Sequence, residues 1–157
     1  MSQFQLDDLD LEILTELGKN SKAPLKNISK KLGVPASTIH TRIKRLEKNK
    51  VIRTYVPKID YKKIGVEILA FVMISFDKSQ TNLDQEEVAQ KIAKVPNVQE
   101  VNIIAGQFDI LLKIRAKSID DLGKLVVKRL KNINGVGHTI TYIVLNNVIE
   151  KNFIAPK

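Results

Sequence analysis

Residues 25–46 read LKNISKKLGVPASTIHTRIKRL, and most of what can be predicted for the N-terminal third of the chain rests on them. Apolar residues recur at helical spacing on both sides of Gly33, which predicts one helix ending at that glycine and another over about residues 36–49. Gly33 permits the positive φ with which a chain commonly leaves a helix. Four apolar side chains are expected to fill the angle between the two helices: Ile28, Leu32, Val34 and Ile39. The spacing therefore predicts a helix-turn-helix.

A further helix is predicted ahead of this motif over residues 7–18, where apolar residues recur every three or four positions and Gly18 offers a stop. Aspartates at its start suit the positive end of the helix dipole. Behind the motif, residues 51–60 (VIRTYVPKID) alternate and contain Pro57, which predicts a short strand pair, or wing, leading into a linker. The N-terminal part is thus expected to be a winged-type helix-turn-helix bundle.

Beyond Gly65, strand-like runs alternate with helical ones in the order βαββαβ. Strands are predicted over residues 67–76, 98–105, 109–116 and 138–150, and helices over residues 83–95 and 118–133. This order predicts a ferredoxin-like domain, in which a four-stranded antiparallel sheet carries two helices on one face. The opposite face is expected to present apolar residues such as Phe71 or Val72 to a partner.

The fold class is therefore α+β, with two domains. We expect a helix-turn-helix DNA-binding domain over residues 1–56, a linker over 57–66 and the ferredoxin-like domain over 67–157. The chain has no Cys, which excludes disulfides, thiol catalysis and Cys-ligated zinc. Its N-terminus is acidic, and no apolar run approaches the length that spans a bilayer, so a cytoplasmic protein without a membrane partner is expected.

The formal net charge of +9 is concentrated in one part of the chain. From Lys19 to Lys63 there are 14 Lys and Arg residues but only two acids, Glu47 and Asp60. Such a block usually indicates a polyanionic partner, although a solvated lysine-rich face is a common alternative. Charge alone does not choose between them.

The helix that follows Gly33 is the candidate for contact with double-stranded DNA. In a helix-turn-helix this second helix enters the major groove, where its first residues reach base edges and flanking cations meet phosphates. The residues assigned to this role are Ser37, Thr38, His40, Thr41, Arg42, Lys44, Arg45 and Lys48. A three-helix bundle whose polar side chains merely face water is the alternative, and a solvated imidazole explains His40 equally well. The turn glycine, the apolar spacing and the basic block together favour DNA binding.

The chain resembles the leucine-responsive, or feast/famine, Lrp/AsnC regulators of bacteria and archaea. The likeness runs in order through LDDLDLEIL, ISKKLGV, TRIKRLEKNKVIRTY, GQFDILLKI and NGVGHTITYIVL, and so covers nearly the whole chain. It implies a transcriptional regulator with a hinge between its domains, a βαββαβ domain that forms homodimers through its sheets and often builds octamers, and amino-acid effectors bound between subunits. Two positions depart from the usual pattern. Pro35 stands where relatives usually have Ser, so either Ser37 begins the recognition helix later or Pro35 lies in its first turn. Lys50 stands where relatives commonly have Gly.

The resemblance places the effector beside the loop of Gly106, Gln107, Phe108 and Asp109, with His138, Thr139 and Thr141 closing the pocket from a neighbouring subunit. Free amides of such a turn can hold a carboxylate, and Asp109 can pair with an ammonium group. The residues also have simpler interpretations. Gly and Asp are ordinary hairpin-turn residues, and Thr is common in strands.

An enzyme and a general chromatin-coating protein are the two alternatives to a regulator. No metal-ligand set, nucleophile elbow or phosphate-binding loop is present in the sequence, so no enzyme and no cofactor are expected. Some haem-pathway decarboxylases resemble these regulators in fold, and His138 would then be the residue to suspect. A general chromatin-coating protein is the second alternative, and it predicts little sequence preference.

Overall fold

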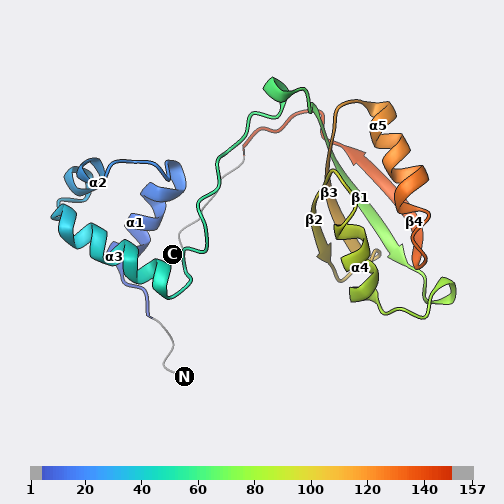
Figure 1. Ribbon diagram of the computed structural model, residues 1–157, viewed down its shortest axis with the longest axis horizontal. Helices are drawn as coiled ribbons and strands as arrows, with labels where there is room; N and C mark the ends of the chain where they lie inside the picture. Colours follow the sequence, from blue (N-terminus) through green and yellow to red (C-terminus); the bar gives the residue numbers. More distant parts are fainter. Residues whose placement is uncertain (1–4, 150–157) are drawn as a thin grey trace. The chain divides into compact units, whose positions relative to one another are not determined.

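The computed structural model describes residues 5–149, which form two compact units (Figure 1). The units divide between Lys58 and Ile59, inside the segment predicted as a linker, and again after Asn147, so that the described residues Val148 and Ile149 are grouped with the first unit. The predicted domain bounds themselves stay a prediction.

The N-terminal unit is built from three helices: α1 (Asp8–Lys19), α2 (Leu25–Leu32) and α3 (Ala36–Lys48). Gly33 adopts a φ of 68°, so the predicted turn between α2 and α3 is confirmed. One side chain from α1, one from α2 and three from α3 make the buried core: Ile13, Ile28, Ile39, Ile43 and Leu46. Helix α3 therefore turns one apolar stripe inward and leaves its other side to solvent.

Helix α1 begins with a reciprocal cap and runs past its predicted end. The Asp7 side chain accepts a hydrogen bond from the Asp10 backbone amide at 2.9 Å, and the Asp10 side chain accepts one from the Asp7 amide at 3.2 Å. Gly18 was expected to stop the helix, but α1 continues to Lys19. The amide of Asn20 still donates to the carbonyl of Glu16 at 3.0 Å, so the last turn keeps its bonds despite the glycine.

The predicted strand pair over residues 51–60 is wrong, because the structure has no strand there. Of these ten residues only Ile52 is partly buried, so the segment has no apolar face to pack. It also lacks the Gly or Asn turn that closes a tight hairpin, and Pro57 has no amide to donate to a ladder. A short 3₁₀ turn, Lys62–Ile64, follows and ends at Gly65 with a φ of 73°.

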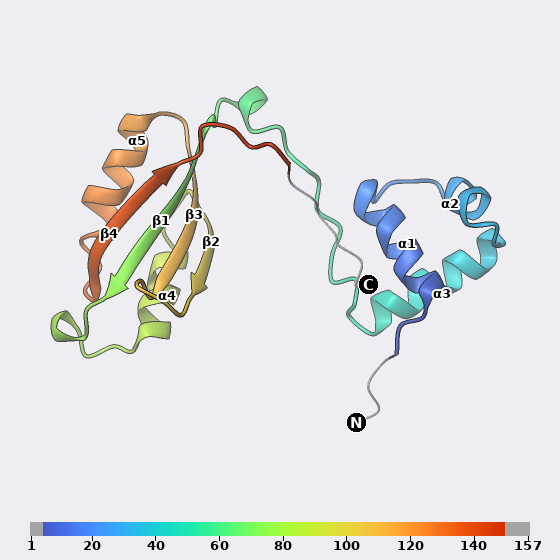
Figure 2. The ribbon, with the colours of Figure 1, turned by 180° about the vertical axis from the view of Figure 1, so that it is seen from behind.

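The second unit is a four-stranded antiparallel sheet with two helices on one face, which confirms the ferredoxin-like prediction (Figures 1 and 2). Its elements are β1 (Ile68–Phe76), α4 (Gln85–Ala93), β2 (Val98–Ile103), β3 (Ile110–Ala116), α5 (Ile119–Lys124) and β4 (Val136–Ile143). A 3₁₀ turn, Lys78–Gln80, precedes α4, and a π-helical segment, Leu125–Leu130, continues α5. The strand order is β2-β3-β1-β4, which places β1 and β3 at the centre.

The two faces of the sheet differ as side-chain alternation requires. Ala70, Val72 and Ile74 of β1 are fully buried in the core shared with α4 and α5, whereas Phe71 and Met73 lie on the opposite face and are only partly buried. The prediction of an open apolar face is therefore right for Phe71. It is wrong for Val72, because a one-residue step along a strand reverses the face.

Strand β4 is shorter than predicted. It ends at Ile143, which pairs with Ala70, and the amide of Val144 adds one more bond to the carbonyl of Leu69. Its partner strand β1 begins only at Ile68, so residues beyond Val144 have no strand residues of β1 left to pair with. The last predicted strand residue, Glu150, lies outside the described residues.

Candidate nucleic-acid interface

The solvent side of α3 carries all eight residues predicted to contact DNA. Its inward stripe is fixed by the core isoleucines and Leu46, so positions between them must point outward. Six of the eight are exposed: Ser37, His40, Thr41, Lys44, Arg45 and Lys48. Thr38 and Arg42 are half-buried at the edge of this face. The structure thus brings the predicted residues together on one helical surface.

Helix α3 starts at Ala36, directly after Pro35. Pro35 has φ −54° and ψ 140°, and it offers no side-chain acceptor to the first turn. Amides of a first helical turn have no partner within the helix, so they need an acceptor from elsewhere. Ser37 therefore does not cap the helix but lies one residue inside it, on the outward face. Pro35 takes the position just before the first turn.

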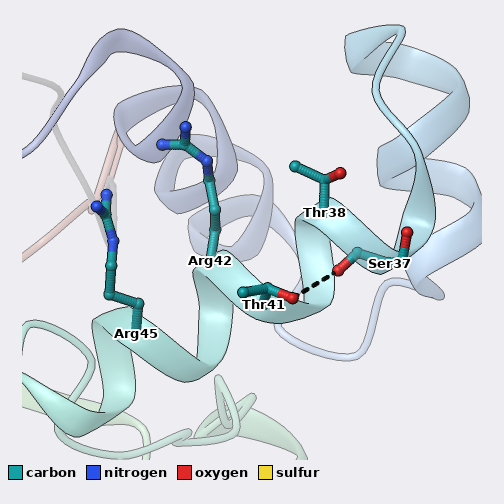
Figure 3. A pocket seen from close by; sticks show the side chains of 5 residues that line it. All are labelled: Ser37, Thr38, Thr41, Arg42 and Arg45. Atoms are coloured by element: carbon teal, nitrogen blue, oxygen red, sulfur yellow. Dashed lines mark hydrogen bonds between the residues drawn. The ribbon is translucent and has the colours of Figure 1, made fainter.

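A pocket of about 370 Å³ opens on this face of α3 (Figure 3). It is lined by five of the predicted residues: Ser37, Thr38, Thr41, Arg42 and Arg45. The Thr41 hydroxyl donates to the carbonyl of Ser37 at 3.0 Å, while both arginine side chains extend from α3 toward α1. The lining consists of hydroxyl and guanidinium groups, which are donors suited to phosphate oxygens and base acceptors.

Both arginines are held by the acidic start of α1. Arg42 donates from Nη1 to Asp10 Oδ1 at 3.1 Å and to Asp7 Oδ2, and Arg45 donates from Nη2 to Asp10 Oδ2. The Asp10 side chain is 0% exposed, whereas that of Arg45 is 42% exposed. Hydrogen bonding to Arg42 holds the pKa of the Asp7 carboxyl below its ordinary value, and the same bond raises the pKa of Arg42. The aspartates were interpreted from the sequence only as dipole partners, and their contact with α3 was missed.

A second cluster lies near the C-terminal end of α3. Lys44 Nζ lies 3.0 Å from Glu47 Oε2, and the Tyr55 hydroxyl donates to Glu47 Oε1 at 2.9 Å. Desolvation of the Tyr55 hydroxyl and its hydrogen bond to the Glu47 carboxylate raise the pKa of Tyr55 to about 12. The bond from Lys44 lowers the pKa of Glu47. Glu47 therefore offsets part of the positive charge of Lys44, whereas Lys48 extends from the exposed side of the helix.

The second predicted site, residues 106–109, is a turn anchored to the sheet. Asp109 Oδ2 accepts from the Phe76 amide at 2.7 Å, and the Asp109 amide donates to the carbonyl of Ile74 at 3.0 Å. The Asp109 carbonyl accepts from Gln85 Nε2 at 3.0 Å. No sequence pattern predicted Gln85 or Phe76, because these contacts join positions 24 and 33 residues apart.

Strand β4 brings only part of the predicted effector set to one place. Thr139 pairs with Ile74 and Thr141 with Val72, so both threonines share the helix-covered face. His138 alternates to the other face, and its amide donates to Ser75 Oγ at 2.8 Å. Within one chain, β1 lies between β4 and β3, so Thr139 is two strands away from the 106–109 turn, which precedes β3. His138 points to the opposite side of the sheet.

Among residues 5–149, no group of three or more His, Cys, Asp or Glu side chains is placed to hold a metal ion. Within the same range, no helix is both long enough and apolar enough to cross a bilayer.

The two halves of the chain match two known families. Residues 6–47 match the AsnC-type helix-turn-helix domain, and residues 69–153 match the Lrp/AsnC ligand binding domain. The chain is 44% identical over 146 residues to an uncharacterised HTH-type transcriptional regulator of Pyrococcus furiosus, covering 93% of this chain and 97% of the relative. It is 39% identical over 140 residues to the HTH-type transcriptional regulator FL11 of the same organism, covering 89% of each.

Solved structures give the same result. The chain is similar to Escherichia coli AsnC with a TM-score of 0.84 and 26% identity, over 98% of this chain and 100% of that one. It is equally similar to a feast or famine regulatory protein of M. tuberculosis in complex with L-methionine, with a TM-score of 0.84, 26% identity, and coverage of 97% and 100%.

Proposed function

The chain belongs to the Lrp/AsnC family of HTH-type transcriptional regulators, and from this premise we propose how its two units act. Its relatives are transcriptional regulators rather than enzymes, so the decarboxylase alternative is set aside. We propose that α3 binds specific double-stranded DNA, that an amino acid binds the second unit, and that a homodimer couples the two events.

The exposed face of α3 carries the DNA-binding proposal. Ser37, Thr38 and Thr41 occupy the first turns of the helix, the part that reaches base edges in this motif. Lys44 and Lys48 lie farther along, where cations meet phosphates. His40 shares the exposed face, and Arg42 and Arg45 border the pocket. Short hydroxyl side chains at the start and cations after them are the division of roles that groove binding requires.

Selection of bound sequences from random duplex DNA tests this proposal. The full chain is expected to enrich one motif and to bind it at least a thousandfold more tightly than a scrambled duplex of the same length, within the range common for specific regulators. The ratio must be measured at one stated salt concentration, because nonspecific binding weakens steeply with salt. A chromatin-coating protein would instead enrich nothing and give a ratio near one, which would overturn the proposal.

The second unit carries the effector proposal. We propose that the amino acid binds at the turn of Gly106, Gln107, Phe108 and Asp109, completed by Thr139 and Thr141 of a neighbouring subunit. His138 lies on the opposite face of β4 and is left out of this proposal. Asp109 uses Oδ2 to bind the Phe76 amide, and a carboxylate keeps further acceptor sites for an ammonium group. The mycobacterial relative in complex with L-methionine supports an amino acid as the ligand class.

Asp109→Asn is the sharpest variant for this site. An amide oxygen still accepts from Phe76, but the negative charge that would bind an ammonium group is gone. Calorimetry with the twenty amino acids, methionine first, is expected to find a ligand for the parent and at least a tenfold weaker affinity for the variant. Glu86→Gln, on the exposed side of α4, removes the same charge elsewhere and should bind as the parent does. Equal affinity of the parent and Asp109→Asn would remove Asp109 from the site.

The open face of the sheet carries the assembly proposal. Ile140 and Tyr142 of β4 are 41% and 52% exposed, beside the partly buried Phe71 and Met73 of β1. Contiguous apolar surface of this kind usually marks an interface. A second copy presenting the same face would cover it through a two-fold axis. Pairing of two DNA-binding units would then place two α3 helices on neighbouring half-sites.

A further inference from the structure

Four charged side chains join α1 to α3 at the edge of the DNA-binding face. Asp7 and Asp10 lie in the capped start of α1, and Arg42 and Arg45 lie one turn apart on α3. The two oxygens of the Asp10 carboxylate bind different arginines, Oδ1 to Arg42 and Oδ2 to Arg45. One buried carboxylate therefore sets the spacing of two guanidinium groups.

Because Asp10 is buried, its carboxylate is stable only when both of its arginine partners are in place. Asp10 is 0% exposed, and a buried carboxylate without cationic partners is strongly unfavourable. It obtains those partners only when Arg42 and Arg45 both extend toward α1. Long side chains that would otherwise sample many rotamers are thereby held in one. The arginines border the pocket with Ser37, Thr38 and Thr41, so its shape depends on a residue that does not line it.

The same cluster is electrically balanced. Two arginines and two ionised aspartates sum to no net charge, so the group contributes little to the long-range attraction of a polyanion. Its exposed N–H donors remain directional, and Arg45 is 42% exposed at the surface. Directional donors without net charge favour recognition of one arrangement of acceptors over another. They add little to the counterion release that governs nonspecific binding.

We propose that Asp10 is a positioning residue for sequence recognition. It holds Arg42 and Arg45 as aimed hydrogen-bond donors beside the pocket, so that the pair acts on specificity rather than on bulk attraction for DNA. Asp7 supports the same arrangement through Arg42. This inference rests on the proposed DNA-binding function of α3.

Three charge-matched variants of the full chain test the proposal. Asp10→Asn keeps the size of the side chain but replaces one of its two acceptor oxygens with an NH2 donor, so one of the two arginines loses its acceptor. Asp7→Asn keeps a good helix cap and withdraws a carboxylate from Arg42. Asp8→Asn is the control, because Asp8 is exposed in the same turn and its side chain makes no hydrogen bond or ion pair within residues 5–149.

The probes are a duplex selected by the parent protein from random DNA and its scrambled counterpart. Asp10→Asn is expected to lower the ratio of selected to scrambled affinity by roughly tenfold, the size of one lost specific contact. Its affinity for scrambled DNA should be unchanged or higher, because a negative charge is gone. Asp7→Asn should change the ratio in the same direction. Asp8→Asn should leave the ratio as in the parent.

The outcomes distinguish a failure of the proposed DNA-binding function from a failure of the positioning role of Asp10. If the parent selects no sequence, the proposed function fails and this inference fails with it. If the parent selects a sequence but Asp10→Asn and Asp8→Asn give equal ratios, only the positioning role is overturned. A loss of affinity for both duplexes by the same factor, together with a lower unfolding temperature, would show a purely structural Asp10. Should Asp10→Asn fail to fold, Asp7→Asn decides, and a parent-like ratio for it overturns the proposal.

Discussion

The Asp109 carboxylate accepts the hydrogen bond of the Phe76 amide at 2.7 Å, at the place where β1 shifts its register with β4. This bond joins the turn before β3 to the end of β1. Asp109→Ala leaves the part-buried amide without that acceptor and should lower the free energy of unfolding by about 1–3 kcal/mol. Asp109→Asn should lose much less, because its amide oxygen can still accept. Urea unfolding of both variants checks this, and equal losses would contradict it.

Lys48 is expected to act through charge alone. Lys48→Ala should weaken binding to selected and scrambled DNA by the same factor and lower the magnitude of the salt slope, log K against log salt, by about 0.9. Thr41→Val should instead change which sequence is preferred. Titrations at four salt concentrations measure the first effect, and repeated selection measures the second. If Lys48→Ala altered the preferred sequence, the division between phosphate-contacting and base-contacting residues would be wrong.

Gly135 is required by close packing. A Cβ there would lie 2.8 Å from methyl carbons of Thr81 and Val88, and the backbone has a φ of 96°. Gly135→Ala should therefore destabilise the second unit by about 2 kcal/mol or more. Gly106→Ala is the comparison, since its Cβ would meet nothing within 4 Å and only the unusual φ of 153° is strained. Thermal unfolding should rank Gly135→Ala as clearly the less stable variant.

Ile140 tests the assembly surface. Ile140→Glu places a charge on the open face of β4 and should shift the full chain toward monomer, because a charge buried against apolar neighbours is unfavourable. Ile119→Glu changes an exposed isoleucine of α5 and should leave assembly unaltered. Sedimentation velocity at matched concentrations distinguishes them. A parent-like oligomer for Ile140→Glu would place the interface elsewhere.

Acid should destabilise the N-terminal unit through Asp7. Arg42 lowers the pKa of Asp7 in the folded chain. Once the pH falls to about 4 and below, the Asp7 carboxyl is therefore protonated to a greater extent in the unfolded chain than in the folded chain. The contribution to stability is complete above that pH and disappears as the pH falls through the lower folded pKa. Asp7→Asn should therefore show a smaller fall in unfolding temperature between about pH 5 and pH 2. A parallel fall in both proteins would contradict the assigned pairing.

Local patterns were sufficient for most of the helices and for the order of elements. The turn at Gly33 and the βαββαβ order follow from spacing, because side-chain periodicity directly reflects which face is buried. Failures occurred where a neighbour distant in sequence decides. The wing over residues 51–60 had alternation but no face to pack against, and β4 ended at Ile143 because its partner strand had ended.

The amino-acid sequence was enough to identify α3, its outward residues and the likeness to the Lrp/AsnC regulators, since all three depend on residues close together or on short motifs in order. The tertiary structure alone showed that Arg42 and Arg45 bind Asp7 and Asp10, and that Val72 rather than Phe71 faces the helices. The Arg–Asp pairs join residues 32 to 35 positions apart, and the buried face of β1 is chosen by helices that follow it in the chain. Hydrogen bonds and strand register select such partners only once the elements have packed, and no local pattern encodes them.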